Sequence, residues 1–201
     1  MEIKTFVNKH DFSCNVYVCS TEKSNFIIDL GYFDDDIKAY VKSLPKIDFV
    51  LQTHGHFDHI MGLNDFCKDF PDVPVYIHNS EIEVAKSPVK NGSSLMSYAF
   101  VPEVDFCALK EGDNFINDEK IFVLHTPGHT QGSCIFYFAN ENCVFFGDTI
   151  IEFGVGRTDL PTGNEAELVA SLEKIKEMKL PEKTMCYFGH GNSFSYGEYR
   201  R

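Results

Sequence analysis

The sequence predicts an α/β fold built from two halves, each a β-sheet covered by helices on its outer face. Short runs rich in Val, Ile, Phe and Tyr alternate with segments whose apolar residues recur at helical spacing. This order of strands followed by helices occurs twice along the chain, as expected for two stacked layers of the same kind. With 201 residues, 43% of them hydrophobic, the chain is long enough to form a core without disulfides. We therefore expect a single domain over 1–201.

The first half begins with three short strands and a helix. The strands are expected at 2–7, 14–20 and 25–30, with turn-forming Asn, Asp, Ser and Lys between them. A helix is expected from Asp34 to Leu44, because its apolar residues share one face and Pro45 follows. We interpret the run Asp34-Asp35-Asp36 as acidic residues that complement the helix dipole, rather than as a metal site.

The remaining elements continue this alternation. The first half is completed by a strand at 47–53, a polar loop at 54–59, a helix from about Ile60 to Phe70, a strand at 74–78, a short helix from Ser80 and a loop at 87–103. The second half is expected to hold strands near 104–108, 120–126, 134–139 and 143–147, a helix near 165–178 and a strand near 184–188. No sequence repeat is detected, so the two halves are alike only in the order of their elements.

Charge and cysteine content argue against several classes of protein. With 18 Lys and Arg against 30 Asp and Glu, the net charge of -12 opposes non-specific nucleic-acid binding. The 7 cysteines form no C-x-x-C pair and are odd in number, which indicates neither a disulfide framework nor a zinc ribbon. The N-terminus lacks a signal-peptide pattern, and no apolar run approaches the roughly 20 residues of a membrane span. We expect a cytoplasmic protein that acts on a small molecule and binds neither nucleic acid nor membrane.

The strongest chemical signal is a run of potential metal ligands directly after the expected strand at 47–53. Its sequence, His54-Gly55-His56-Phe57-Asp58-His59, places four potential ligands within six positions. Imidazole and carboxylate groups suit zinc, iron or manganese, and a loop at the end of a strand places them at a surface cleft. A solvated polar loop is the weaker interpretation.

Three further residues share this context, since each follows an apolar strand and lies beside glycine: His129, Asp148 and His190. Each alone is more often an ordinary loop residue, but together with the first loop they supply seven ligands. Seven ligands are too many for one tetrahedral site and suit two metals that share a carboxylate and leave a position open for water. The sequence therefore predicts two divalent metal ions, with zinc as the expected metal and iron or manganese as alternatives.

These motifs resemble those of the metallo-β-lactamase superfamily and, within it, of the glyoxalase II-like (hydroxyacylglutathione hydrolase-like) hydrolases. The resemblance spans essentially the whole chain and is carried by Asn15-Val16-Tyr17, Ile28-Asp29-Leu30-Gly31, THGHFDHIMG at 53–62, HTPGHTQGS at 125–133, FFGDT at 145–149, GVGRTDLPTG at 154–163 and GHG at 189–191. It implies the metallo-β-lactamase fold, an αββα sandwich of two mixed sheets with outer helices, with the metals at one edge between the sheets.

The resemblance also implies a role for each ligand: His54, His56 and His129 would hold the first metal, Asp58, His59 and His190 the second, and Asp148 would bridge them. Two cations beside one water lower its pKa toward about 7, so a bridging hydroxide forms without a Ser or Cys nucleophile. Asp58 and Asp148 would orient that hydroxide. The implied activity is hydrolysis of a thioester such as an S-acylglutathione.

Departures from related families narrow this prediction. Flavodiiron oxidoreductases place Glu where His56 stands, and β-lactamases of the main subclass place Cys where Asp148 stands. Only 11 residues follow His190, so the C-terminal helical domain with which glyoxalase II holds glutathione is expected to be missing. Lactones and other esters stay open as substrates. A persulfide dioxygenase with one iron is the alternative from another enzyme class, because it shares the HxHxDH, HTPGHT and GRTD motifs.

Arg157 occupies the loop in which the family places a cation that meets the anionic part of the substrate. Contact with substrate and structural pairing with Asp159 or another loop carboxylate are equally open interpretations of this arginine. We expect His125 to be structural rather than a support for His129, four residues later, and we expect His10 and His78 at the surface or at strand ends.

Overall fold

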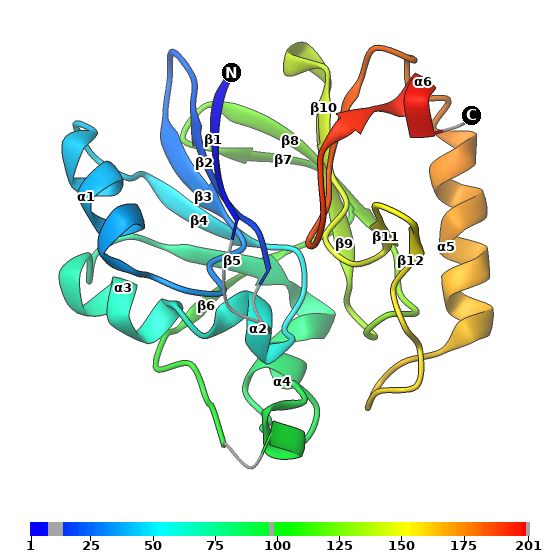
Figure 1. The fold of residues 1–201 in the computed structure, drawn as a ribbon, viewed down its shortest axis with the longest axis horizontal. Coiled ribbons are helices and arrows are strands. Elements are labelled where there is room, and N and C mark those ends of the chain that lie inside the picture. The colour runs from blue at the N-terminus through cyan, green and yellow to red at the C-terminus, as the bar shows by residue number, and fades with distance from the viewer. Residues whose placement is uncertain (8–13, 97–98, 200–201) are drawn as a thin grey trace.

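The fold consists of two six-stranded sheets that lie face to face, with helices on their outer sides (Figure 1). This computed structural model describes residues 1–7, 14–96 and 99–199. The helices α1 (Asp35–Ser43) and α3 (Leu63–Asp69) lie against one sheet, and α5 (Glu165–Glu177) lies against the other. The predicted α/β sandwich is thereby confirmed.

The first sheet has the order β1-β2-β3-β4-β5-β6. Its strands are β1 Glu2–Phe6, β2 Val16–Ser20, β3 Asn25–Ile28, β4 Phe49–Gln52, β5 Val75–His78 and β6 Phe106–Leu109. The pairs β1/β2 and β2/β3 are antiparallel, whereas β3/β4, β4/β5 and β5/β6 are parallel, so the sheet is mixed. The central strand β4 is buried along its whole length. Its first three residues are therefore all apolar and do not alternate with polar residues.

The second sheet has the order β14-β13-β10-β9-β8-β7. Its strands are β7 Gly112–Ile116, β8 Glu119–His125, β9 Cys134–Phe138, β10 Cys143–Phe145, β13 Met185–Tyr187 and β14 Phe194–Ser195. The pair β10/β13 is parallel and the other pairs are antiparallel. A separate hairpin pairs β11 (Ile150–Ile151) with β12 (Gly154–Val155).

Side-chain caps begin the two longer helices. The Asp34 carboxylate accepts a hydrogen bond from the backbone N of Ile37 at 2.9 Å, which confirms the helix-start interpretation of the acidic run. The Asn164 side chain caps α5 in the same way. The shorter helical segments are α2 Phe57–Ile60, α4 Ile82–Ala85, α6 Tyr196–Tyr199 and the 3-10 turns η1 Asn79–Glu81, η2 Ser93–Met96 and η3 Ala139–Glu141.

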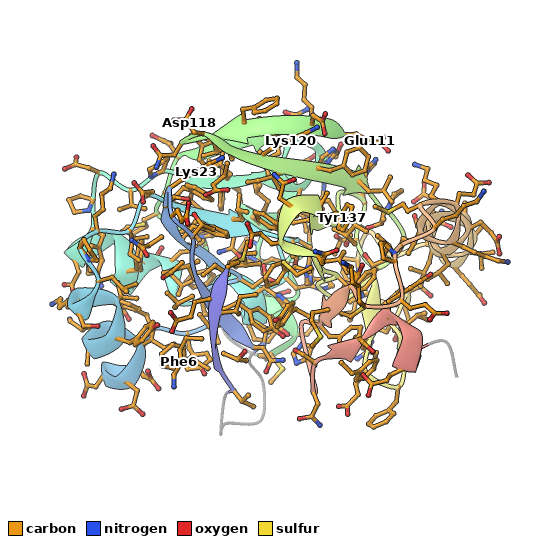
Figure 2. All side chains as sticks on the ribbon, turned by 90° about the horizontal axis from the view of Figure 1, so that it is seen from above. Phe6, Lys23, Glu111, Asp118, Lys120 and Tyr137 are labelled. Atoms are coloured by element: carbon orange, nitrogen blue, oxygen red, sulfur yellow. The ribbon has the colours of Figure 1, made fainter. Side chains whose placement is uncertain are left out.

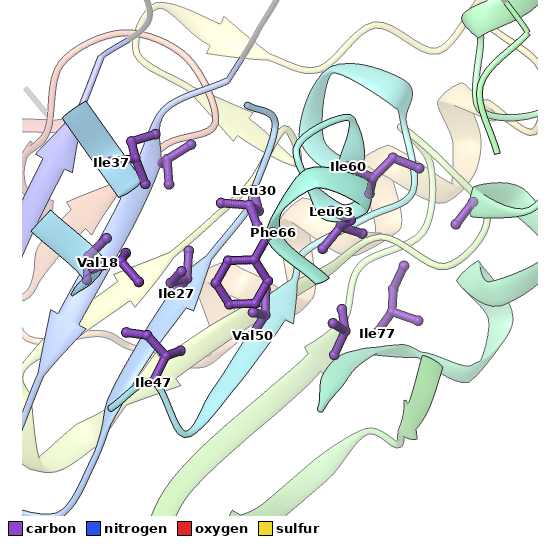
Figure 3. Packing of buried hydrophobic residues seen from close by; sticks show 14 of the residues in the cluster. Val18, Ile27, Leu30, Ile37, Ile47, Val50, Ile60, Leu63, Phe66 and Ile77 are labelled. Carbon is purple, nitrogen blue, oxygen red and sulfur yellow. The ribbon is translucent and has the colours of Figure 1, made fainter. Parts of the chain in front are cut away.

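Three apolar clusters separate the four layers. One lies between the first sheet and its helices, where Val50 and Phe66 pack together (Figure 3). A second, aromatic cluster fills the space between the sheets, and there the Phe26 ring stacks on Phe49 with a centroid distance of 4.7 Å. The third lies between the second sheet and α5 and includes Ile175. These clusters hold the sheets at a fixed spacing, so the loops at one edge have a defined geometry.

Polar contacts join the two sheets where the β2–β3 turn meets the β7–β8 turn. The Lys23 Nζ donates to the carbonyl of Asp118 at 2.9 Å, and both residues lie at this end of the molecule (Figure 2). The buried Glu119 carboxylate accepts hydrogen bonds from the hydroxyls of Thr21 and Ser24. The sheets are therefore tied by hydrogen bonds as well as by apolar packing.

Three predictions about the elements are wrong. The segment 54–59 is not entirely loop, because α2 begins at Phe57, and the expected helix over 60–70 is split where the backbone N of Gly62 donates to the carbonyl of Leu30 at 2.9 Å. The strand expected near 104–108 is β6, which pairs with β5 and so belongs to the first sheet. The strands β7, β11, β12 and β14 were not predicted, because they are short or polar.

All seven cysteines are free, and Cys134 and Cys143 are buried in strands. Within the described part of the chain, no helix combines the length and the apolar character needed to cross a membrane.

Phe49→Ala is expected to lower the free energy of unfolding by about 3–5 kcal/mol, because it removes a fully buried ring between the sheets and leaves a cavity. Urea denaturation measures this change. Phe115→Ala is the matched control: this ring is 71% exposed, and its loss is expected to cost less than about 0.5 kcal/mol. Similar losses in both variants would contradict the described packing.

Candidate metal centre

The predicted ligands lie on loops that leave the carboxyl ends of four strands. His54 and His56 follow β4, and His129, Asp148 and His190 follow β8, β10 and β13. These last three strands run in the same direction, because β8 and β10 are both antiparallel to β9 and β13 is parallel to β10. Their carboxyl ends therefore open at one edge of the second sheet.

The structure brings all seven predicted ligands together. In three groups the potential ligand atoms all lie within 4.8 Å of one another: His54, His56 and His129; His54, His59 and Asp148; Asp58, His59 and His190. The first and the third group are the two sets expected from the sequence. Asp58 and His59 lie in the first turn of α2 rather than in a loop, which places them on a short rigid element.

Asp148 lies between the two sets. Its Oδ1 is 3.4 Å from His59 Nε2, and its Oδ2 is 3.4 Å from His190 Nε2 and 3.6 Å from His129 Nε2. One carboxylate thus faces imidazoles of both groups. This position is the one that a carboxylate shared by two cations requires.

Orphaned polar atoms show that the site fits metal ions. The Nε2 atoms of His54, His56 and His59 and the Oδ1 atom of Asp148 are buried and have no hydrogen-bond partner. Leaving such a buried atom unpaired costs about 1–3 kcal/mol, so a cluster of them in one place is unfavourable without a ligand. Cations held by the cluster would satisfy atoms that face it, and the donor set of imidazoles and carboxylates suits zinc, iron or manganese.

The remaining nitrogens of three histidines have partners that fix the rings. His54 Nδ1 lies 3.2 Å from Thr53 Oγ1, and His59 Nδ1 lies 3.0 Å from Asp29 Oδ2. His129 Nδ1 lies 2.8 Å from the carbonyl oxygen of Arg157. Hydrogen bonds of this kind set the ring orientation and the tautomer of a metal-binding histidine.

Asp29 contacts His59 directly and also contacts Thr53, the partner of His54. This supporting role was not predicted. Asp29 is buried, with a positive φ of 52°, and its carboxylate also accepts hydrogen bonds at 2.8 Å from the backbone N and the Oγ1 of Thr53. Asp29 falls within the strand expected at 25–30 and does not adjoin glycine, so the context that singled out Asp148 did not single it out. Asp29 therefore connects the end of β3 to the segment that carries His54 and His59.

The protonation states of His54, His56 and His129 suit metal binding. Burial lowers the pKa of His54 well below its ordinary value, lowers that of His56 to about 3 and lowers that of His129. These imidazoles are therefore neutral at pH 7, the form that binds metal. Burial acts to raise the pKa of Asp148, but the neighbouring His59 and His190 outweigh it and hold that pKa well below the usual range. The carboxylate is therefore ionised.

Close packing around Asp148 requires glycine at 189. A Cβ at this position would overlap with Asp148 Oδ1 and would lie 2.7 Å from the His59 ring. The Gly189 backbone N also donates to the carbonyl of Gly147 at 2.8 Å, which joins the loop of His190 to the loop of Asp148. The glycine beside His190 is thus a steric requirement of the cluster.

Glu81 supports the first ligand loop from behind and was also missed. Its side chain is buried, and Oε1 accepts a hydrogen bond at 2.8 Å from the backbone N of Gly55, between His54 and His56. A Cβ on Gly132 would lie 2.5 Å from Glu81 Oε2, so the loop that carries His129 also packs against this carboxyl group. A glutamate in a short predicted helix is expected to be exposed, so nothing in the sequence around Glu81 indicated this role.

A cleft of about 410 Å³ opens over the cluster. It is lined by the ligands His56, Asp58, His129, Asp148 and His190 and by Phe57, Asn91, Gly92, Leu95, Met96, Arg157 and Leu160. Volumes of this size accommodate a small molecule.

Arg157 both lines this cleft and pairs with its neighbour. Its Nε and a terminal guanidinium nitrogen donate to the two carboxylate oxygens of Asp159 at 2.7 and 2.6 Å. The structural pairing considered from the sequence is therefore present. Both side chains are more than 60% exposed, so the pair is weak and open to exchange, and substrate contact stays a prediction.

The other histidines lie outside the cluster. His78 ends β5, as predicted, but it is buried rather than at the surface, because its ring stacks on that of His125 at 4.3 Å. His125 Nε2 lies 3.0 Å from the carbonyl oxygen of Gln131, which agrees with the structural role expected for it. His10 lies outside the described residues.

Glu81→Gln is expected to change how stability depends on pH. Burial raises the pKa of Glu81 to about 7, against an ordinary value near 4.5. The folded state therefore favours the protonated carboxyl group, and its contribution to stability is full below pH about 4.5 and lost as the pH rises through about 7. Urea unfolding of both proteins at pH 5 and pH 8 should show the parent losing on the order of 1–3 kcal/mol more than Glu81→Gln. Parallel profiles would show that Glu81 does not titrate in this range.

Comparisons with known proteins agree with this geometry. The family model described as the metallo-beta-lactamase superfamily matches residues 11–190. The chain is 34% identical over 180 residues to the "Probable metallo-hydrolase YqgX" of Bacillus subtilis, covering 88% of this chain and 84% of that protein. The relative "Probable metallo-hydrolase MJ0888" of Methanocaldococcus jannaschii is 31% identical over 209 residues, covering 96% of this chain and 97% of its own.

Two solved structures have the same architecture. The BLEG-1 B3 metallo-beta-lactamase superposes with a TM-score of 0.87 at 31% identity, over 98% of this chain and 95% of that chain. TTHA1623 in a di-iron-bound form superposes with a TM-score of 0.85 at 27% identity, over 100% of this chain and 98% of that chain. Sequence, fold and ligand cluster therefore lead to one assignment, and the chain belongs to the metallo-beta-lactamase superfamily.

Proposed function

We propose that this protein is a glyoxalase II-like metal-dependent hydrolase that cleaves thioesters at a binuclear centre. The observation that carries the proposal is the position of Asp148 between two groups of ligands, beneath a cleft of small-molecule size. The relatives named as probable metallo-hydrolases support the reaction class, and the di-iron form of TTHA1623 supports the number of metals.

The ligands divide between two ions, with Asp148 shared: His54, His56 and His129 would hold one, and Asp58, His59 and His190 the other. When bound, the ions would lower the pKa of water from 15.7 toward about 7 and withdraw electron density from a substrate carbonyl group. Zinc and iron both suit this ligand set, and we propose zinc as the expected metal, with iron supported by the TTHA1623 structure.

The side chains around the cleft favour water as the nucleophile. Among the described residues that line it, there is no Ser, Cys, Lys or Tyr. Asp58 and Asp148 supply carboxylate oxygens that accept hydrogen bonds from an attacking water and so orient its lone pair.

The same lining favours a thiol as the leaving group. A thiol has an ordinary pKa near 8.5, so it departs as a thiolate without a proton donor, whereas alkoxide or amine departure needs one. Apart from histidines that belong to the ligand groups, the described lining residues offer no such acid. Thioesters therefore match the site better than amides or alkyl esters.

Metal content and a panel of substrates test this proposal together. We expect close to two zinc or iron ions per chain by plasma mass spectrometry of protein purified without added metal or chelator. The panel is an acyl thioester, an alkyl ester, a lactone and a β-lactam, with the thioester expected to have the highest kcat/KM. One iron per chain with oxygen uptake on glutathione persulfide would instead indicate a dioxygenase, and a preference for the β-lactam would indicate the activity named for BLEG-1.

Asp148→Asn is expected to lower thioester turnover at least about 100-fold, because it keeps the shape but removes the negative charge between the two cations. Metal retention after dialysis should fall as well. Asp113→Asn is the matched control, since this carboxylate pairs with Lys120 on the surface and lies outside the ligand groups. Unchanged metal content and turnover in Asp148→Asn would show that Asp148 is not shared between two ions.

Arg157→Ala is expected to raise KM for an anionic thioester about 10-fold, with much less effect on a neutral thioester, because the guanidinium is the one Lys or Arg side chain among the described residues that line the cleft. Steady-state kinetics on both substrates measure the difference. Asp159→Asn should lower KM for the anionic substrate, since it frees Arg157 from its partner. Equal losses on both substrates would assign Arg157 a structural role only.

A further inference from the structure

We propose that one wall of the cleft, formed by Phe57, Leu95 and Met96 and called here the apolar wall, binds the acyl chain of the substrate. The preferred substrates would then be thioesters of uncharged aliphatic acyl groups of several carbons. This inference rests on the proposed thioester hydrolysis and specifies which part of the substrate is selected.

The lining residues from the two halves of the chain differ in chemistry. The N-terminal half of the chain contributes the apolar wall, together with the neutral Asn91 and Gly92. The C-terminal half contributes Arg157 and Leu160. A carbonyl group held over the ligand cluster can thus direct one substituent along uncharged surface and the other toward the guanidinium.

The apolar wall exposes hydrophobic surface beside polar, reactive groups. Leu95 is 64% exposed and Met96 is 44% exposed, although both are large apolar side chains. Exposed apolar surface that continues into a polar cleft is typical of a ligand-binding site rather than of an ordinary protein surface. An aliphatic chain lying on these side chains would remove their surface, and its own, from water.

Hydrogen bonds hold this wall in place beside the ligands. The carbonyl of Asn91 accepts from the backbone N of Phe57 at 2.9 Å, which joins the segment to the start of α2, the helix of Asp58 and His59. The buried Asn91 side chain donates to the carbonyls of Ala85 and Phe100 at 3.1 and 2.9 Å. These bonds fix the backbone beside the ligand cluster, so little ordering is required when a chain binds.

The charges around the cleft indicate that the bound acyl chain is uncharged. Among the lining residues that the structure describes, Arg157 is the one Lys or Arg side chain, and Asp159 already pairs with it. A carboxylate on the acyl group would lie against Leu95 and Met96, where nothing compensates the loss of its hydration. The net charge of -12 disfavours such an anion further.

The test is a chain-length series of thioesters that share one thiol, N-acetylcysteamine, with acyl groups from acetyl to octanoyl, on the protein loaded with metal. We expect kcat/KM to rise about two- to fourfold per methylene until the wall is covered. A second series with an acetyl group and thiols of increasing length should show a weaker trend. Dependence on thiol length and not on acyl length would overturn the proposal.

A double variant and a control variant test whether the apolar wall causes the preference for long acyl chains. In the double variant Leu95→Ser with Met96→Gln, the preference of octanoyl over acetyl, measured as the ratio of their kcat/KM values, should fall at least about 10-fold. Both side chains are largely exposed, so the substitutions should not disturb folding. Phe115→Ser removes an exposed ring on β7, outside the lining residues, and should keep the parental preference. An unchanged preference in the double variant would overturn the proposal.

Calorimetric titration with octanoate and butanoate separates this inference from the proposed function. We expect octanoate to bind the metal-loaded parent at least about 10-fold more tightly than butanoate, and the double variant to bind both alike. That result would support the apolar wall even if no thioester were cleaved, in which case the proposed hydrolysis alone would fail. Equal affinities in the parent would overturn the apolar wall even if thioesters were hydrolysed.

Discussion

Unpaired polar atoms, buried together between two sheets, are the constraint on which the rest of this structure depends. The Nε2 atoms of His54, His56 and His59 and the Oδ1 atom of Asp148 have lost water without gaining a hydrogen bond. Such an arrangement persists only if the surrounding fold holds it. The aromatic core between the sheets keeps these loops at a fixed spacing, and the glycine at 189 leaves room for Asp148 beside His59. Stability elsewhere in the molecule therefore maintains a site that would be unfavourable without cations.

The supporting contacts also explain why the ligands form one unit rather than separate loops. Asp29 ties β3 to Thr53 and to His59, and Glu81 lies behind Gly55 and against Gly132. Each of these carboxyl groups connects segments that are remote in the sequence. They do not face the cleft, but through the backbone and the imidazole nitrogens they determine where the ligand atoms lie. The precision of the cluster thus comes from buried acidic residues that touch no substrate.

The ligands could be identified from the sequence because their signal is local. His54 to His59 form one short run, and His129, Asp148 and His190 each follow a strand and adjoin glycine. The two-layer fold was also predictable, since it depends on the alternation of strands and helices. The position of β6, the start of α2 and the burial of Glu81 and His78 were not, because each depends on a partner far along the chain. Arg157 is intermediate: its partner Asp159 is two residues away, and pairing was anticipated, whereas contact with a substrate is a property of the complex.

The origin of the ligands in both halves of the chain has a consequence for the life of the protein in the cell. His54, His56, Asp58 and His59 come from the half that forms the first sheet, and His129, Asp148 and His190 come from the half that forms the second. Ions bound there would join the halves directly, and at a concentration 1,000 times the Kd each would add about 4 kcal/mol to the free energy of unfolding. Metal-starved protein would open more often between its sheets and expose its aromatic core to proteases. The supply of metal would then set not only how active each molecule is but also how many molecules survive.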